Sequence, residues 1–363
     1  MTLTAEMTGV GQKTPVAAID CDIHNAAASN KSLLKYLPER WKRHHELFGG
    51  RGHSGANYPR ANLNAARTDS WPPSGLPPGA DLDFLREQLL DYWGLAYGVL
   101  NPLNGAGAQL NLEYAAALSA ATNEWQIAEW TDPEPRLRAS LIVPYEDGDL
   151  AAEVIHRYGD NPAFVQILLV ARTSEPLGRR KYWKMYEAAV EHNLPVGFHF
   201  GGSGGAPITG VGWPSFYIED HAGMPTSFYT QMTSLVCEGV FERFPTLKFV
   251  LIEGGFAWLP SLMWRLDKAY SRLKEEVPQL NRLPSEYIRE HFWITTQPVE
   301  EPSRPKHFPQ LLEQLNMNDR LMFATDYPHW DFDAPDEAIP ASLPEDLRRD
   351  ILAGNAKKLY GLT

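Results

Sequence analysis

Four apolar runs in this chain each end in a side chain that can bind a metal ion or transfer a proton. The first run ends in Asp22 and His24, which stand two residues apart, and the later runs end in His199, Glu253 and Asp326. If the four runs are parallel strands of one barrel, these groups converge on a single face. Carboxylates and imidazoles are ligands of hard and borderline cations. This recurrence constrains the fold and the chemistry together.

Short apolar or β-branched runs alternate with longer amphipathic segments along the whole chain. Such alternation indicates parallel strands joined by helical crossovers. We expect eight strands, over Val16–Asp20, Leu95–Leu100, Arg138–Val143, Phe164–Val170, Leu194–Phe198, Lys248–Ile252, Phe292–Thr296 and Arg320–Thr325. We expect helices over Ala106–Trp130, Asp149–Tyr158, Arg180–His192, Ser227–Phe244, Leu259–Lys274, Phe308–Leu315 and Pro344–Leu359.

Bulk properties narrow the class of protein. With 363 residues and 44% apolar content, the chain can bury a large core, and we expect one domain over residues 1–363. The net charge of −12 argues against a general nucleic-acid or anionic-membrane surface, and no apolar run reaches the roughly 18 residues of a membrane span. Cys21 and Cys237 show no paired spacing, and the first residues lack a secretory pattern, so we expect a cytoplasmic protein.

Two long segments interrupt the alternation. The segment from Asn25 to Ala80 is rich in Gly, Pro, Asn and Arg, and we expect it to be a lid or an interface insertion. The second segment, Gly201–Pro214, follows His199. It lacks the ending of a phosphate-binding loop and the spacing of a dinucleotide fingerprint, which excludes nucleotide binding.

The ligand candidates also have structural alternatives. Residues two apart on a strand share a face, so Asp22 and His24 can both point inward and suit zinc, manganese or iron. Asp20 shares this parity and is an alternative or supporting carboxylate. Taken singly, the Asp-x-His pair could cap a loop, His199 could be a structural histidine, and Asp326 could form a turn through its own side chain.

Glu253 and His329 are the candidates for proton transfer. Burial would raise the pKa of Glu253 towards a value useful for acid–base chemistry, although it could instead be a fixed-charge ligand. His329 lies three residues beyond Asp326 and could carry a proton near neutral pH, or be an exposed loop histidine.

Together these motifs resemble the amidohydrolase-2 branch of the amidohydrolase superfamily, which includes aminocarboxymuconate-semialdehyde and resorcylate decarboxylases. The motifs are Asp20-Cys-Asp-Ile-His24, the strand ending in His199, Glu253-Gly-Gly-Phe-Ala-Trp-Leu-Pro260 and Thr325-Asp-Tyr-Pro-His329. The resemblance extends from Val16 to about Leu359. It implies a (β/α)8 TIM barrel with long insertions after the first and fifth strands, and a homodimer.

The resemblance also implies one divalent cation per chain, zinc or manganese, held by Asp22, His24, His199 and Asp326. Two departures stand out. The first motif is Asp-x-His where many members have His-x-His or Glu-x-His, which makes the site harder and more tolerant of manganese. The sixth-strand His-Gly-Gly is here Glu253-Gly-Gly, so the acid–base role falls to Glu253, His329 or the loop residue His221, or activity is lost.

Three functions follow as hypotheses. The first is a hydrolase in which Asp326 or Glu253 accepts a proton from metal-bound water. The second is a non-oxidative decarboxylase, placed slightly behind because the sixth-strand His is missing. The third is a non-catalytic barrel that binds a small molecule.

Loop side chains suggest a cyclic or aromatic substrate, unless they pack the loops or form a subunit interface. The aromatic residues are Trp41, Tyr58, Trp71, Trp213, Phe216, Tyr217 and Trp330. Arg172 could hold a substrate carboxylate, as could Arg51, Arg60 and Arg67, although surface arginines are common. We place Trp213, His221 and Gln297 with Arg172 as substrate-binding candidates.

Overall fold

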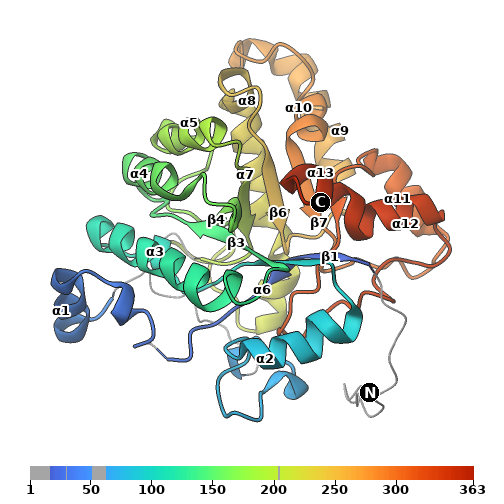
Figure 1. The fold of residues 1–363 in the computed structure, drawn as a ribbon. Coiled ribbons are helices and arrows are strands. Elements are labelled where there is room, and N and C mark those ends of the chain that lie inside the picture. Colours follow the sequence, from blue (N-terminus) through green and yellow to red (C-terminus); the bar gives the residue numbers. More distant parts are fainter. Residues whose placement is uncertain (1–16, 30, 51–62, 203–204) are drawn as a thin grey trace.

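Eight parallel strands lie side by side in chain order in the computed structural model (Figure 1), which describes residues 17–29, 31–50, 63–202 and 205–363. The strands are β1 (Ile19–Ile23), β2 (Tyr97–Leu100), β3 (Leu137–Ile142), β4 (Phe164–Val170), β5 (Val196–His199), β6 (Phe249–Ile252), β7 (Phe292–Thr295) and β8 (Leu321–Met322). The Cys21 amide donates to the Phe323 carbonyl at 3.0 Å, and the Asp326 amide donates to the Asp22 carbonyl at 3.1 Å. These bonds join β1 to the segment that directly follows β8 and so bring the two ends of the sheet together, which confirms the expected (β/α)8 barrel.

Helices surround the barrel and bury the outer face of its strands, while the inner face is buried in the barrel interior. Burial on both faces explains why the strand sequences are continuous apolar runs. They are α1 (Glu39–Phe48), α2 (Leu82–Leu85), α3 (Leu112–Gln126), α4 (Gly148–Tyr158), α5 (Trp183–Glu191), α6 (Tyr217–Gly223), α7 (Pro225–Cys237), α8 (Val240–Arg243), α9 (Leu259–Leu273), α10 (Pro284–His291), α11 (His307–Leu315), α12 (Glu345–Arg349) and α13 (Asn355–Tyr360). Side chains fix some of the starts: Asn111 accepts the Tyr114 amide before α3, and Asp147 accepts the Leu150 amide before α4.

Several expected boundaries were wrong. The first strand runs three residues further than Asp20, so Asp22 lies inside it. The last strand is only two residues long, because the backbone after it bonds to side chains and turns at Asp326, whose φ is +62°. Gly239 adopts a left-handed φ of +74° and divides the expected helix Ser227–Phe244 into α7 and α8.

Other helical segments also differ from expectation. The expected helix Ala106–Trp130 begins with a separate 3₁₀ turn and ends in a π-helical one. Pro344–Leu359 divides into α12, a π-helical turn and α13. Helices α1, α2, α6 and α10 were not expected.

The described part of the Asn25–Ala80 segment packs onto the rest of the molecule. Helix α1 contacts α3 through Trp41, which is buried, and through a 2.6 Å bond between His45 Nδ1 and the Tyr114 hydroxyl. The Arg67 amide donates to the Pro328 carbonyl at 3.0 Å, so the segment also touches the turn after β8. Tyr58, Arg51 and Arg60 lie outside the described residues.

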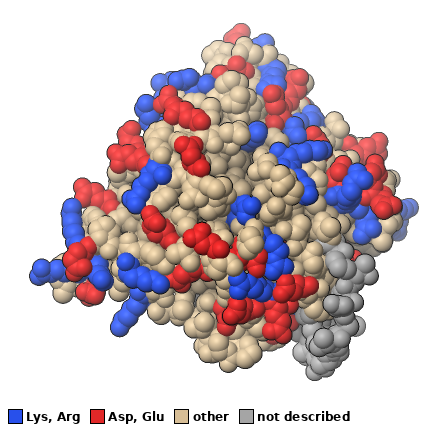
Figure 2. All heavy atoms as spheres, in the orientation of Figure 1, with Lys and Arg blue, Asp and Glu red and all other residues tan. Residues whose placement is uncertain are grey.

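Charged side chains of both signs are interspersed over the face shown in Figure 2. Among the described residues, no helix is both long and apolar enough to cross a bilayer.

Candidate metal centre and active site

Four side chains converge at the carboxyl end of the barrel. Asp22 and His24 come from β1 and the residue after it, His199 ends β5, and Asp326 lies in the turn after β8. All four are buried, and their candidate ligand atoms lie within 4.8 Å of one another. The strands therefore bring together the four residues that the sequence singles out.

Unsatisfied polar atoms in this cluster fit a cation. Asp22 Oδ2 and His199 Nε2 are buried, lack any hydrogen-bond partner in the described chain, and lie 3.4 Å apart. His24 Nε2 is also 3.4 Å from Asp22 Oδ1. Ligands about 2.1 Å from one cation lie roughly 3.0–3.5 Å from one another. Because leaving buried polar groups unpaired is costly, the arrangement suits one divalent ion.

Backbone carbonyls orient both imidazoles. His24 Nδ1 is 2.7 Å from the Asn101 carbonyl, and His199 Nδ1 is 2.6 Å from the Phe200 carbonyl. A carbonyl only accepts, so the Nδ1 atoms carry protons and the Nε2 atoms face the cluster. This is the arrangement that metal-binding histidines use.

Electrostatics in the cluster favour the charged forms of His24 and Asp326. Burial lowers the pKa of His24, but the carboxylates of Asp22 and Asp326 outweigh burial and raise that pKa to about 9. Burial acts to raise the pKa of Asp326, yet His329 and His24 hold it well below its usual range. A cation binding here would replace the proton that His24 otherwise holds between two carboxylates.

Asn101, which follows β2, holds two members of the cluster at once. Its side-chain nitrogen donates to Asp22 Oδ1 at 2.8 Å, and its backbone carbonyl accepts from His24 Nδ1 at 2.7 Å. Ser140 and Gln166 in turn donate to the Asn101 side-chain oxygen at 2.5 and 3.3 Å. This buried network fixes the direction in which Asp22 presents its free oxygen.

We expect Asn101→Ala to weaken metal binding about 10- to 100-fold, the usual cost of removing a residue that orients a ligand. Competition with a fluorescent chelator measures the affinity. Asn123→Ala is the matched control, because Asn123 is equally buried but bonds only to the Ile142 backbone at 2.9 Å. Equal affinities in the two variants would contradict the orienting role.

Asp20 is not a ligand. Its Oδ1 accepts the Asp22 and Thr325 amides at 3.1 and 2.9 Å, and its Oδ2 accepts the Thr325 hydroxyl at 2.6 Å. Both oxygens are therefore occupied in joining β1 to the segment after β8. This position supports the barrel seam rather than the metal cluster.

Glu253 follows β6 and faces the cluster. Its Oε2 lies 3.1 Å from His199 Nε2. Its backbone is left-handed, with a φ of +58°, and its amide donates a hydrogen bond to Thr295 Oγ1. Burial raises the pKa of Glu253 well above its ordinary value, and Asp326 and Asp331 add to the effect. Burial and the neighbouring carboxylates therefore favour the protonated form of this side chain.

Asp331 is a site residue that sequence reasoning missed. Burial and the neighbouring Asp326 raise its pKa to about 8, and Gln297 Nε2 donates to its Oδ2 at 3.1 Å. Candidate ligand atoms of Asp331, Glu253 and His221 lie within 4.8 Å of one another. Its position two residues after His329, in the same turn, was the available signal.

The other acid–base and substrate candidates fall in different places. His329 bonds to Asp326 Oδ1 at 2.8 Å and stacks on His24 with ring centroids 4.4 Å apart. His221 Nε2 lies 3.4 Å from Asp331 Oδ2, and burial lowers its pKa. Gln297 also reaches Asp326 Oδ2, at 3.3 Å. These residues therefore surround the cluster rather than lie on distant loops.

The arginine and tryptophan candidates differ in their position relative to the cluster. Arg172 lies beside the cluster, pairs with Asp220 at 2.6 Å, and keeps a buried Nε atom without a partner in the described residues. Arg67 instead pairs with Asp69 and covers the Phe332 ring. Trp213 is 47% exposed and is not among the residues that line the cavity beside the cluster. Only Arg172 of these is placed to meet a substrate there.

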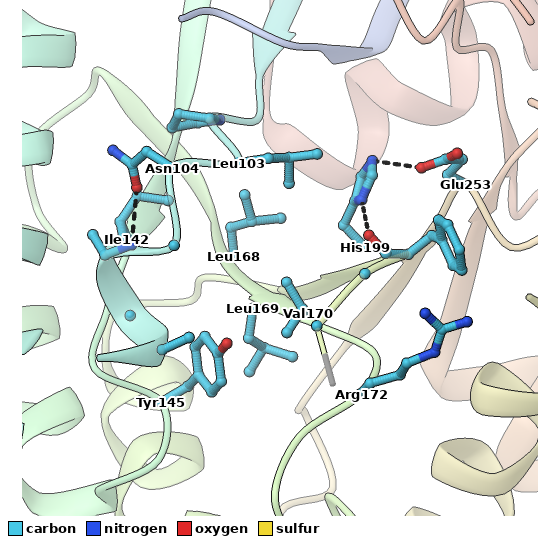
Figure 3. A pocket seen from close by; sticks show the side chains of 18 of the residues that line it. Leu103, Asn104, Ile142, Tyr145, Leu168, Leu169, Val170, Arg172, His199 and Glu253 are labelled. Atoms are coloured by element: carbon cyan, nitrogen blue, oxygen red, sulfur yellow. Dashed lines mark hydrogen bonds and ion pairs between the residues drawn. The ribbon is translucent and has the colours of Figure 1, made fainter. Parts of the chain in front are cut away.

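A cavity of about 450 Å³ opens beside the cluster. Figure 3 shows His199, Glu253 and Arg172 on one side of it, and Ile142 and Tyr145 on the other. Tyr217 and Trp330, two of the aromatic residues expected near a substrate, also contribute to its lining. The space is large enough for a small organic molecule next to the proposed ligands.

The chain matches the amidohydrolase family model over residues 19–362, so it belongs to that family. Its sequence is 27% identical over 324 residues to gamma-resorcylate decarboxylase of Rhodococcus jostii, covering 80% of this chain and 93% of that protein.

Solved structures share the fold. An amidohydrolase from Mycobacterium avium subsp. paratuberculosis superposes with a TM-score of 0.70 at 22% identity, covering 96% of this chain and 100% of its own. The 5-carboxyvanillate decarboxylase of Novosphingobium aromaticivorans, solved with manganese and 4-hydroxy-3-methoxy-5-nitrobenzoic acid, superposes with a TM-score of 0.69 at 19% identity, with 98% of each chain covered.

Proposed function

We propose that this protein is a metal-dependent, non-oxidative decarboxylase of an aromatic carboxylic acid. The observation that carries the proposal is the buried Glu253 carboxyl, which lines the cavity with its Oε2 3.1 Å from His199 Nε2 and whose surroundings favour the protonated form. Decarboxylation needs an acid at this place, because the carbon that loses CO₂ must gain a proton. Similarity to a resorcylate decarboxylase over most of both chains supports the same choice.

Asp22, His24, His199 and Asp326 would hold one zinc or manganese ion. When bound, the ion would neutralise and polarise the substrate's carboxylate and an adjacent oxygen. Manganese bound in the Novosphingobium enzyme supports this choice of cation. Gln297 and Asn101 would keep the carboxylates of Asp326 and Asp22 in place.

In the proposed reaction Glu253 donates its proton to the ring carbon that bears the carboxylate. The bond between that carbon and the carboxylate then breaks, its electron pair returns to the ring, and CO₂ leaves. Glu253 is left as a carboxylate and regains a proton from solvent. The balance is one aromatic carboxylate and one proton converted into one arene and one CO₂.

Hydrolysis, placed first from the sequence, needs Asp326 or Glu253 to accept a proton from water. The raised pKa of Glu253 favours its protonated form, which cannot accept one, and the lowered pKa of Asp326 makes that carboxylate a weak base. A screen of metal-loaded protein tests the choice: hydroxybenzoates on one side, and aryl esters, lactones and amides on the other. Membrane-inlet mass spectrometry detects the gas. The proposal expects CO₂ from at least one acid and no acid production from the esters, lactones or amides, and the reverse pattern would establish a hydrolase.

Arg172 is the proposed partner of the substrate's carboxylate. We expect Arg172→Met to raise KM about 10- to 150-fold with a smaller change in kcat, since a hydrogen bond to a charged group contributes about 1.5–3 kcal/mol. Steady-state CO₂ release gives both constants. Arg67→Met is the control, because Arg67 also pairs with an aspartate, Asp69, but is not among the residues that line the cavity. Unchanged KM in the Arg172 variant would remove this role.

A further inference from the structure

We propose that the half of the cavity away from the metal cluster binds an extended apolar substituent of the substrate that carries one hydrogen-bonding oxygen near its end. This inference rests on the proposed function and specifies its substrate class. The substrate would be an aromatic acid with an alkyl, alkenyl or aryl substituent, not a single-ring acid.

Different strands contribute polar and apolar side chains to the mouth of the barrel. The ligands and Glu253 come from β1, β5, β6 and the turn after β8. Ile142, Leu168, Leu169 and Val170 line the cavity at the ends of β3 and β4. All except Leu169 share strand parity with Ser140 and Gln166, whose side chains join the interior network around Asn101. One half of the mouth is therefore polar and the other apolar.

Two polar side chains of the apolar half keep an atom without a hydrogen-bond partner in the described residues: Gln109, through its buried Oε1, and Tyr145, through its hydroxyl. Asn104 accepts the Ala106 amide and donates to Thr122 Oγ1, each at 3.0 Å, so it offers little to a ligand. Tyr145 is 5% exposed and lines the cavity, but its hydroxyl has no hydrogen-bond partner in the described residues. Burial raises the pKa of this phenol, which keeps it a neutral donor.

The volume of the cavity also supports a substrate larger than a single ring. A cavity of about 150 Å³ lined by apolar side chains is enough for benzene, whereas this one measures about 450 Å³. Figure 3 shows Tyr145 across the cavity from Glu253, with Leu168 and Val170 between the two sides. A ring held beside His199 would leave the space in front of these leucine and valine side chains for a substituent.

Binding of decarboxylated products isolates the subsite from catalysis. Resorcinols with alkyl chains of zero to six carbons, attached at each free ring position, are titrated calorimetrically into manganese-loaded protein. Affinity should rise about four-fold per methylene in the favoured series, as for burial of a CH₂ group, and then level off. Leu168→Phe should abolish this rise. Leu273→Phe, at a 55% exposed position on α9, should keep it.

Two further variants complete the test: one repeats the steric block at another position in case Leu168→Phe misfolds, and the other tests the hydrogen bond to the oxygen of the substituent. Ile142→Phe should also remove the dependence on chain length. Tyr145→Phe should weaken ω-hydroxyalkyl resorcinols about 2- to 12-fold, the range for one net hydrogen bond, and leave the plain alkyl series unchanged. Affinity that does not depend on chain length at any position, or dependence that survives both phenylalanine variants, overturns the proposal. Chain-length dependence without CO₂ release from any acid would instead retain the subsite and reject the decarboxylase.

Discussion

Replacing His199 by alanine should leave the purified protein without its cation and lower the rate of decarboxylation about 10³-fold or more. His199 ends β5, and its buried Nε2 lies between the Asp22 and Glu253 carboxyls, at 3.4 and 3.1 Å, without a hydrogen bond to any described residue. Removing it takes away one of four proposed ligands and one of only two nitrogen ligands. Polarisation by a bound cation contributes several kcal/mol to such reactions, which is the source of the expected loss.

Elemental analysis and CO₂ release are the two readouts for this variant. His291→Gln is the matched control, because His291 is equally buried but lies on α10, where it bonds to the Leu247 carbonyl and stacks on Phe241. The control should retain about one cation per chain. A His199 variant with full metal content and normal turnover would show that the cation binds elsewhere.

Glu253→Gln should lower kcat about 10²- to 10⁴-fold, the usual contribution of a general acid, while metal content and product binding stay unchanged. Glutamine fills nearly the same space and still lacks a charge, but it cannot supply the proton. The loss should therefore appear in kcat and not in affinity for the product phenol.

The direction of the pH dependence of activity tests whether Glu253 acts as the acid. Burial and the nearby carboxylates raise the pKa of Glu253, so its protonated form persists to higher pH than that of an ordinary glutamate. Activity should hold on the acid side of that pKa and fall as the pH rises through it, and Glu253→Gln should lose this fall. Glu300→Gln is the control, since burial also raises the pKa of Glu300, which accepts the Phe256 and Ala257 amides instead. An unchanged pH profile in the Glu253 variant would assign the proton to another group.

How far the sequence predicts the fold depends on what holds each element. Strand β4 has the expected bounds, Phe164–Val170, because a strand buried on both faces is a continuous apolar run. The segment after β8 is also a continuous apolar run, but it is not a strand. The Thr325 amide and hydroxyl bond to the side-chain oxygens of Asp20 instead of to the backbone of a neighbouring strand. Such a long-range contact between the two ends of the chain leaves no local pattern.

The site follows a similar division. The four cluster residues were identifiable because strand ends place their side chains at one mouth, where two-residue parity decides direction. Asp331 was missed because it lies in a turn, where no periodicity marks which side chains face inward. The arginines could not be ranked without knowing their partners: Arg67 is paired with Asp69, whereas Arg172 reaches the cavity.

The most direct test of the account is the rate of CO₂ release as manganese is added to metal-stripped protein. An alkyl-substituted hydroxybenzoate and an unsubstituted one serve as substrates. The account predicts no release without metal, a rise in proportion to the manganese added, and a break at one equivalent per chain. CO₂ release that is independent of metal, or turnover that requires metal but yields no CO₂, would contradict it.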